Sequence, residues 1–489
     1  MNMERSGGIL LHISSLPGKY GIGSFGKQAY KFVDFLKDSG IKLWQICPLG
    51  PTGFGNSPYQ SYSAFAGNPL FIDLEVLVSK GFLKNYELET DVTFSSDKVE
   101  FEKIQEFKTT LFRKAFIRFD QDQNEFIEFR ENEKDWLDDY ALFMSLKKYF
   151  SQKSWLEWDE EIKSRKEIEK YSILLANEIL FQKFLQFQFF QQWNKLRDYA
   201  NSKNVKIIGD IPIYVAADSA DVWSNPSLFL LDENQNPQRV AGYPPDDFSE
   251  TGQFWGNPIF DWQQHKNTNF TWWKKRIASS LKMYDMIRLD HFLGFVRYWS
   301  IPANDDTAKN GKWVEGPKDS IFSSLKDYFG KLPIIAEDLG NITEDVTNLR
   351  DKYEFPGMKI LQFAFGNGND NLYLPHNVEK RSVIYTGTHD NETSEGWYNN
   401  IPQNVKDHLL EYIQKYSDDD ISWKMINSIW DSSADFAIAP MQDFLSLDNS
   451  ARFNTPGTLA DNWIWRMDEN SITENLGKKI LRLNFKWKR

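Results

Sequence analysis

Short apolar segments recur along the chain, and many of them end in polar or acidic residues. A strand buried on both faces is apolar along its whole length, so each segment is typical of a central strand of a parallel sheet. Helical patterns lie between many of the segments, and alternating strands and helices predict a β/α arrangement. Eight such segments favour a closed (β/α)₈ TIM barrel with large, mostly helical insertions between strands. They span residues 8–11, 43–48, 205–211, 286–289, 332–336, 358–365, 382–385 and 436–440.

The helical patterns are clearest in two stretches. Between residues 30 and 39, apolar side chains recur near helical spacing. Between residues 181 and 200 the repeat is stronger, because apolar residues follow one another at steps of three or four, which places them on one face of a helix. These residues are Phe181, Leu185, Phe189, Trp193, Leu196 and Ala200.

The second and third predicted strands are about 150 residues apart, which is too long for a simple crossover. The spacer begins with a loop rich in Gly, Ser, Tyr and Pro at 50–69 and continues with charged, helical patterns at 135–150 and 159–176. We therefore predict a helical insertion subdomain over residues 76–165, which leads into the next barrel helix.

A second long spacer covers residues 215–284 and contains a segment rich in Gly, Pro and Asp at 241–258. Loops this long in compact domains are usually lids or binding loops. We therefore expect 241–258 to be a substrate-covering loop. The sequence shows no repeat of fixed period and no low-complexity linker, so the whole chain, 1–489, is predicted to be one catalytic barrel.

Charge and cysteine content limit the partners and the compartment. The chain has 57 Lys and Arg against 69 Asp and Glu, a net charge of −12, and no basic stripe. This balance argues against nucleic acid and against anionic membranes as partners. Cys47 is the only cysteine, which fits a reducing compartment. The first eight residues lack the apolar core of a signal peptide, and no apolar run approaches the roughly 20 residues of a membrane helix. We expect a cytoplasmic protein.

Aromatic residues make up 16% of the chain, including 18 Trp. Most of these rings are expected in the core, because aromatic side chains dominate core burial. Sugar rings, however, have apolar faces that stack on aromatic side chains. An acidic, aromatic-rich chain with one cysteine is therefore a reasonable composition for an enzyme that acts on carbohydrates.

Arg288 lies near the end of the predicted strand at 286–289, and Asp290, two residues further on, directly follows that strand. On a strand they point to the same face. A cation beside a carboxylate lowers its pKa and keeps it ionised, as a nucleophile or base requires. The alternative is a structural ion pair at the bottom of the barrel. We favour the catalytic interpretation because the polar residues follow the apolar run, at its carboxyl end.

Three other predicted strands also carry acids. Glu337 and Asp338 follow the strand at 332–336, and because adjacent residues face opposite ways only one of them points into the barrel mouth. His389 and Asp390 lie on a Gly-containing turn after the strand at 382–385, and Asp210 lies within the strand at 205–211. The structural alternatives are a helix-capping pair, a turn with an Asx-type bond and a satisfied buried carboxylate, respectively.

The four motifs together are more informative than any one of them. Active sites of these barrels lie at the carboxyl ends of the strands, where all four motifs place acids. Retaining glycosidases need two carboxyls, one ionised and one with a raised pKa. Asp290 beside Arg288 suits the nucleophile, and Glu337 suits the general acid and base. Asp390 would bind sugar hydroxyls and favour a distorted ring.

The order of Asp210, Arg288-x-Asp290, Glu337 and His389-Asp390 is similar to that of the four signature regions of the α-amylase superfamily. More specifically, the chain resembles the 4-α-glucanotransferases of glycoside hydrolase family 77, called amylomaltases or disproportionating enzymes. The matching segments span nearly the whole chain. They lie at residues 53–60, 209–214, 242–246, 252–258, 288–292, 336–340, 387–391 and 452–457.

The resemblance implies a mechanism. Asp290 would attack the anomeric carbon of an α-1,4-glucan, and Glu337 would protonate the leaving oligosaccharide and then activate a sugar 4-hydroxyl. Asp390 would stabilise the transition state, while Arg288 and His389 would hold the sugar and the nucleophile. The family's substrates are α-1,4-glucans, maltodextrins and glucose, and it implies no metal and no organic cofactor. The remaining implied sugar contacts are Ser57, Tyr59, Asp210, Asp246, Gln253, Trp255 and Asn454, of which Asp246 and Trp255 belong to a loop that arches over the cleft.

Two departures from the family pattern are visible. Phe54 stands where many relatives have Tyr at a second glucan-binding site, which puts that site in question. Val378 stands where Tyr is often found.

Two alternative functions follow from the same residues. An α-1,4-glucan hydrolase would use the same carboxylates with water as the acceptor, and the residue types do not separate it from a transferase. A non-catalytic glycan-binding protein on a decayed barrel is disfavoured because all three carboxylates and Arg288 are present. A phosphate-binding barrel is disfavoured as well, because the sequence has no Gly-rich phosphate loop.

Overall fold

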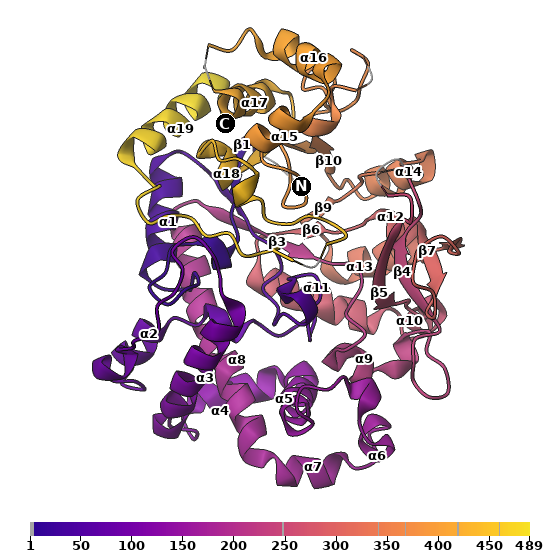
Figure 1. Ribbon diagram of the computed structural model, residues 1–489. Helices are drawn as coiled ribbons and strands as arrows, with labels where there is room; N and C mark the ends of the chain where they lie inside the picture. Colours follow the sequence, from indigo (N-terminus) through magenta and orange to yellow (C-terminus); the bar gives the residue numbers. More distant parts are fainter. Residues whose placement is uncertain (1–3, 247–248, 341, 367, 418–419, 459) are drawn as a thin grey trace.

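The computed structural model describes residues 4–246, 249–340, 342–366, 368–417, 420–458 and 460–489. Eight parallel strands form one sheet in the order β10-β11-β12-β1-β2-β3-β6-β9. All eight fall on the predicted apolar segments, so the barrel prediction is confirmed (Figure 1). They are β1 (Ser6–Leu10), β2 (Leu43–Gln45), β3 (Lys206–Ile211), β6 (Met286–Leu289), β9 (Ile334–Ala336), β10 (Gly357–Ile360), β11 (Ser382–Tyr385) and β12 (Phe436–Pro440).

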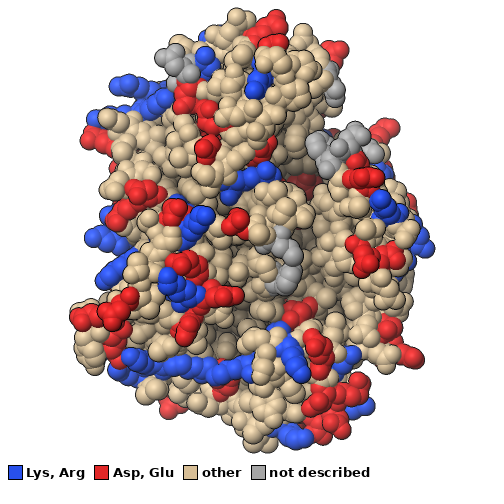
Figure 2. Space-filling view, in the orientation of Figure 1, with Lys and Arg blue, Asp and Glu red and all other residues tan. Residues whose placement is uncertain are grey.

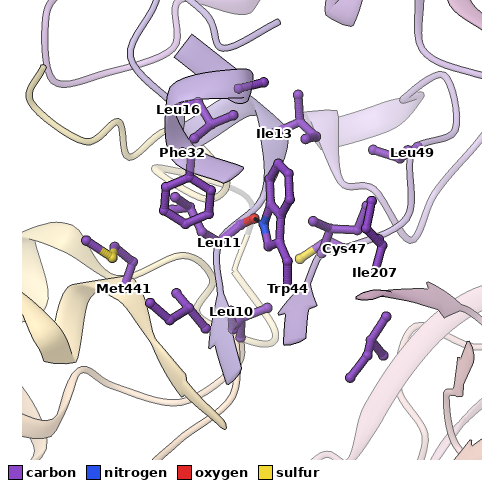
Figure 3. Close-up of a cluster of buried hydrophobic side chains, with 14 of the residues drawn as sticks. Leu10, Leu11, Ile13, Leu16, Phe32, Trp44, Cys47, Leu49, Ile207 and Met441 are labelled. Atoms are coloured by element: carbon purple, nitrogen blue, oxygen red, sulfur yellow. Dashed lines mark hydrogen bonds between the residues drawn. The ribbon is translucent and has the colours of Figure 1, made fainter. Parts of the chain in front are cut away.

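The barrel is packed with apolar side chains on both faces of its strands. Figure 3 shows the part of this core around β1 and β2, where the indole of Trp44 is fully buried and its Nε1–H donates to the Leu11 carbonyl at 2.8 Å. Phe32 packs edge-to-face on Trp44, with ring centroids 5.1 Å apart. Cys47, the single cysteine, is fully buried in the same core. Burial of these apolar surfaces is the main stabilising contribution to the fold.

The seam between β9 and β10 closes the barrel with few backbone bonds. The Ala336 N–H donates to the Pro356 carbonyl at 2.9 Å. The Asp338 carboxylate supplies the next link, because its Oδ1 accepts the Met358 N–H at 2.7 Å. Its Oδ2 accepts Arg350 Nη1 at 2.5 Å. Asp338 therefore points into the seam, which leaves Glu337 to face the other way.

Helices cover the outside of the barrel. Helix α8 (Ala176–Ser202) contains the predicted apolar repeat and buries it against the barrel core. Figure 1 shows both termini on the upper side of the molecule, close to α17 and α19. The other helices of the barrel wall are α1 (Lys27–Asp38), α11 (Thr271–Met283), α12 (Leu293–Val296), α13 (Asp319–Phe329), α14 (Glu344–Lys352), α15 (Ser394–Asn400), α16 (Gln403–Ile413), α17 (Ile421–Asp431), α18 (Met441–Phe444) and α19 (Glu474–Trp487).

The insertion between β2 and β3 is helical, and its helices lie across the lower part of Figure 1. The boundaries 76–165 of a separate subdomain remain a prediction. The helical pattern at 159–176 corresponds to two helices, α6 and α7, which are separated at Arg165, where the backbone adopts a left-handed conformation with φ 62°. The helices are α2 (Leu74–Ser79), α3 (Phe101–Arg118), α4 (Asn124–Asn132), α5 (Lys134–Tyr149), α6 (Glu160–Lys163) and α7 (Ile168–Leu174).

The insertion 215–284 contains regular structure where we expected only a loop. The helices α9 (Ala220–Ser224) and α10 (Trp262–Asn267) flank two strands, β4 (Arg239–Tyr243) and β5 (Gln253–Pro258). These strands join β7 (Arg297–Pro302) and β8 (Lys312–Glu315) in an antiparallel sheet with the order β5-β4-β7-β8. Within the predicted loop 241–258, residues 241–243 belong to β4 and residues 253–258 to β5, and residues 247 and 248 lie outside the described part. No helix in the described residues is long and apolar enough to cross a membrane.

The seam contacts generate a stability prediction. Replacing Asp338 with Ala leaves the Met358 N–H without its acceptor and the Arg350 guanidinium without its buried partner. Breaking a buried ion pair in this way costs about 3–5 kcal/mol. The free energy of unfolding in urea should fall by this amount. Asp351→Ala is the matched control, because Asp351 also pairs with Arg350 but its side chain is 46% exposed. The control should lose no more than about 1 kcal/mol. Equal losses for the two variants would contradict the role of Asp338 in the seam.

Candidate active site

The predicted catalytic side chains are brought together by the carboxyl ends of four barrel strands. Asp210 lies in β3 and Arg288 in β6, and the two residues are direct partners in the parallel pairing of these strands. Asp290 follows β6, and Glu337 follows β9, which pairs with β6. Asp390 lies in the turn after β11. The barrel geometry therefore gathers these side chains at one mouth, as the sequence motifs predicted.

Arg288 is the charge centre of the mouth. Its side chain is 4% exposed, and its Nη1 lies 2.8 Å from Asp210 Oδ2 and 3.0 Å from Asp290 Oδ1. Burial alone would lower the pKa of this guanidinium, but the two carboxylates raise it well above its ordinary value. One fixed cation therefore faces both acids, and the Asp290 side chain, at 27% exposure, remains accessible from the mouth.

Asp210 is fully enclosed by its partners. Both of its oxygens accept from Arg288 Nη1, at 3.0 and 2.8 Å, and Oδ2 also accepts the Tyr59 hydroxyl at 2.8 Å. Burial raises the pKa of Asp210 against the opposing charge of Arg288, and the nearby Asp290 adds to the rise. These contacts match the alternative in which Asp210 is a satisfied buried carboxylate. They link Tyr59 and Arg288 into one hydrogen-bonded unit.

Glu337 has a different environment. Its Oε2 accepts the His291 N–H at 2.7 Å, and its Oε1 accepts the Leu339 N–H at 3.1 Å. Burial raises the pKa of Glu337 to about 8 against the charge of Arg288, and the Asp290 carboxylate raises it further. Glu337 is therefore largely protonated at neutral pH, beside an acid that is paired with an arginine.

Asp390 is held by hydrogen-bond donors on both oxygens. Oδ2 lies 3.2 Å from His389 Nε2, and Oδ1 accepts Asn454 Nδ2 at 2.6 Å. Burial alone would raise the pKa of Asp390, but His389 and Asn454 lower it well below its ordinary range. Arg452 was not predicted as a site residue. It donates to the Asp390 carbonyl and to the Asn454 carbonyl, each at 2.7 Å, and so fixes both residues.

Three rings form one wall of the site. Tyr59 stacks on His389 with centroids 5.0 Å apart, and Trp463 lies 5.7 Å from both rings. Trp463 was also not predicted, since nothing in the sequence separates it from the core tryptophans. The loop that carries Tyr59 is pinned from two sides. Gln60 donates to the Trp255 carbonyl at 3.3 Å, and Gln186 Nε2 donates to the Gly67 carbonyl at 2.9 Å.

Strand β5 brings Gln253 and Trp255 to the mouth. The Trp255 ring meets the His291 ring edge-on at 4.9 Å, and its Nε1–H donates to Gln253 Oε1 at 3.0 Å. His291 directly follows Asp290 and adopts a left-handed conformation with φ 49°. Asp246 lies farther along the β4–β5 turn, where its Oδ1 accepts the Ser249 N–H at 2.8 Å. Residues 247 and 248 of this turn lie outside the described part.

Three other positions that the sequence singled out are Ser57, Val378 and Phe54. Ser57 Oγ accepts the Tyr59 N–H at 3.2 Å, so it shapes the loop that presents Tyr59. Val378 is 4% exposed and belongs to the main apolar core, so this departure from the family pattern is a packing position. The Phe54 side chain lies outside the described part of the structure, and the second glucan-binding site stays untested.

Charged side chains of both signs are distributed over the face of the molecule shown in Figure 2. Within the described residues, no group of three or more His, Cys, Asp or Glu side chains could hold a metal ion. The site contains two nearby carboxyls in different environments, with Asp290 beside the Arg288 cation and Glu337 with a raised pKa.

Comparison with known proteins places the chain in a family. A family model described as 4-alpha-glucanotransferase matches residues 11–472. A 4-alpha-glucanotransferase of Clostridium butyricum is 52% identical over 97% of this chain and 98% of its own length. One from Streptococcus pneumoniae is 46% identical over 99% of this chain and 98% of its own. The solved structure of an amylomaltase from Streptococcus agalactiae in complex with acarbose superposes with a TM-score of 0.97 at 39% identity, covering 99% of this chain and 100% of that one.

The family model and the relatives each cover nearly the whole chain, and the solved structure shares its architecture throughout. The chain belongs to the 4-alpha-glucanotransferase family and, as a member, is a glycosyl-transferring enzyme.

Proposed function

We propose that the enzyme moves a segment of an α-1,4-glucan to the 4-hydroxyl of another glucan or of glucose, with Asp290 as nucleophile and Glu337 as general acid and base. The observation that carries this proposal is the contrast between the two carboxyls. Asp290 is bonded to Arg288, whereas burial holds Glu337 protonated. Retaining glycosyl transfer needs this pair of states in one site.

The first half of the reaction makes a covalent intermediate. An ionised Asp290 oxygen bonds to the anomeric carbon while the glycosidic C–O bond breaks. Glu337 gives its proton to the departing sugar oxygen, so the leaving group departs as a neutral alcohol and Glu337 becomes a carboxylate. The site's backbone N–H donors, from His291 and Leu339, then stabilise the ionised Glu337.

The second half reverses these steps with a new sugar. Glu337 takes the proton of an incoming 4-hydroxyl, whose oxygen bonds to the anomeric carbon. The ester bond to Asp290 breaks, and its electron pair returns to the carboxylate. Two inversions at the same carbon retain the α configuration.

The surrounding residues orient these groups. We propose that Asp390, ionised and held by Asn454, binds sugar hydroxyls and stabilises the transition state, with His389 beside it. Asp210 acts by positioning Arg288 and Tyr59, because its oxygens are already occupied by these two side chains. A cytoplasmic location stays part of the proposal, and the single buried Cys47 fits a reducing compartment.

The choice of acceptor depends on the residues that cover the mouth. The Trp255 ring lies against His291, next to the proposed nucleophile, and the Trp255 Nε1–H donates to Gln253. We propose that these residues and bound sugar exclude water from the covalent intermediate, which favours transfer over the hydrolase alternative. Maltodextrins and glucose are the proposed substrates and acceptors.

Incubation with maltotriose tests the proposed reaction. We expect a ladder of shorter and longer maltodextrins together with glucose, at a constant total of reducing ends, because each cleavage is matched by one new bond. Product lengths can be followed by chromatography and reducing ends by a colorimetric assay on the same samples. Shortening with a matching rise in reducing ends would instead establish the hydrolase.

Asp290→Asn tests the nucleophile. The amide cannot form the ester, so transfer from maltotriose should fall by at least about 10³-fold. The thermal unfolding midpoint is the control for folding, and it should stay within a few degrees of wild type. Substantial transfer by a folded Asp290→Asn enzyme would remove Asp290 from this role.

The raised pKa of Glu337 predicts the pH profile. As pH rises through about 8, Glu337 loses the proton that it donates, so kcat/KM for maltotriose should fall on the alkaline side. Glu337→Gln should stop transfer from maltotriose. It should still react with an activated donor such as α-glucosyl fluoride, which needs little acid help, and the limb near pH 8 should be absent from that reaction. If the Glu337→Gln variant still loses activity near pH 8, the alkaline limb belongs to another group.

The same pKa predicts an effect on stability. A carboxyl whose pKa is raised by folding stabilises the protein at pH values below its ordinary pKa of 4.5, and this contribution is lost as pH rises through about 8. Glu337→Gln should therefore gain stability relative to wild type between pH 5 and pH 8, measured by urea unfolding. The matched control is Glu344→Gln, at an exposed position of α14, which should show no such gain. Parallel pH curves for Glu337→Gln and wild type would contradict the raised pKa.

A further inference from the structure

Trp313 is a large apolar side chain that the fold leaves partly open. It lies in β8, the last strand of the antiparallel sheet in the described structure, and is 39% exposed. Tryptophan is usually much more buried than this, and its ring offers a large, rigid surface to a ligand. The mechanism proposed above does not use it.

Two successive ring contacts connect Trp313 to the catalytic mouth. Its ring meets Trp299, its direct partner on β7, at 5.3 Å, and meets Tyr243 of β4 at 6.4 Å. The Tyr243 ring in turn meets His291 at 6.2 Å. Trp313 is therefore two ring contacts from the residue that follows the nucleophile.

The position of Tyr243 also indicates on which side of the mouth Trp313 lies. A Cβ added at Gly340 would lie 2.9 Å from the Tyr243 hydroxyl, so this tyrosine lies against the turn that follows Glu337. Glu337 gives its proton to the leaving sugar and takes one from the acceptor. Trp313 therefore lies on the leaving-group and acceptor side.

Polar groups beside the ring suit a sugar ligand. The Arg297 guanidinium lies 5.5 Å from the Trp313 ring centroid, and Glu315 is the cross-strand partner of Arg297. A ring with a cation beside it can stack on the apolar face of a glucose unit while the guanidinium bonds its hydroxyls. A bare apolar patch would offer only the first of these interactions.

We propose that Trp313 is the stacking platform of a distal glucan subsite on the acceptor side, which binds a glucose unit of chains too long to be held by the central mouth alone. This inference rests on the proposed function. It makes Trp313 a determinant of chain-length preference. Short acceptors such as glucose do not reach the platform, so they bind independently of it.

Binding to an inactive enzyme tests the subsite directly. In the Asp290→Asn background, calorimetry would give the dissociation constants of maltose, maltotriose, maltopentaose and maltoheptaose. Adding Trp313→Ala should weaken the binding of maltoheptaose about tenfold, because removal of an aromatic contact commonly has an effect of this size. The binding of maltose should be unchanged, because so short a chain does not reach the platform. Trp313→Phe keeps a ring and should restore most of the lost affinity.

The controls separate a subsite from a packing role. Phe485→Ala removes a ring that is 76% exposed on α19, on the opposite side of the molecule from β7, and should change no affinity (Figure 1). An equal loss at all chain lengths would assign Trp313 to packing and overturn the subsite. Unchanged maltoheptaose binding would overturn it too. If the Asp290→Asn parent bound no maltodextrin of any length, the proposed function itself would fail, and this is visible before Trp313 is changed.

Discussion

The buried guanidinium of Arg288 is the interaction on which the site depends. Moving a cation out of water costs much free energy unless an opposite charge lies beside it. A buried carboxylate without a cation would cost as much. Asp210 and Asp290 meet this requirement together, from β3 and from the end of β6. Because Asp210 and Arg288 are paired residues of neighbouring strands, the register of the barrel strands places the Arg288 cation beside Asp290. Tyr59 joins the same unit through Asp210, so the position of the overlying loop depends on it as well.

Glu337 follows the neighbouring strand β9 and lies in an environment that favours its protonated form. Two consecutive acids follow β9, and the alternation of a strand sends them to different environments. Asp338 enters the seam, pairs with Arg350 and bonds the backbone of β10. Glu337 enters the mouth, where burial and the charge of Asp290 raise its pKa. The residue that closes the barrel and the residue that we propose moves the proton are thus adjacent, so the geometry of Glu337 is tied to closure of the fold.

The barrel and its acids could be predicted from the sequence because both produce local patterns. Strands buried on both faces are apolar throughout, and the acids come directly after them. The antiparallel sheet had no such pattern: β8 is short and mostly exposed, and β4 and β5 contain Gly and Pro. Arg452 and Trp463 escaped notice for another reason. Their roles come from contacts with Asp390 and His389, some 60 to 75 residues away along the chain, and spacing within one segment cannot reveal them.

The distinction between transfer and hydrolysis lies outside the barrel strands. Both reactions need the same carboxylates and the same covalent intermediate, and they differ in which hydroxyl reaches it. The residues that can favour a sugar over water belong to the antiparallel sheet, where Trp255 covers His291 and Tyr243 links the mouth to Trp313. A sugar acceptor brings ring faces that stack on these side chains, whereas water gains nothing from them. Under the proposed function, the barrel supplies the reaction and the sheet inserted between its strands supplies the preference for the acceptor.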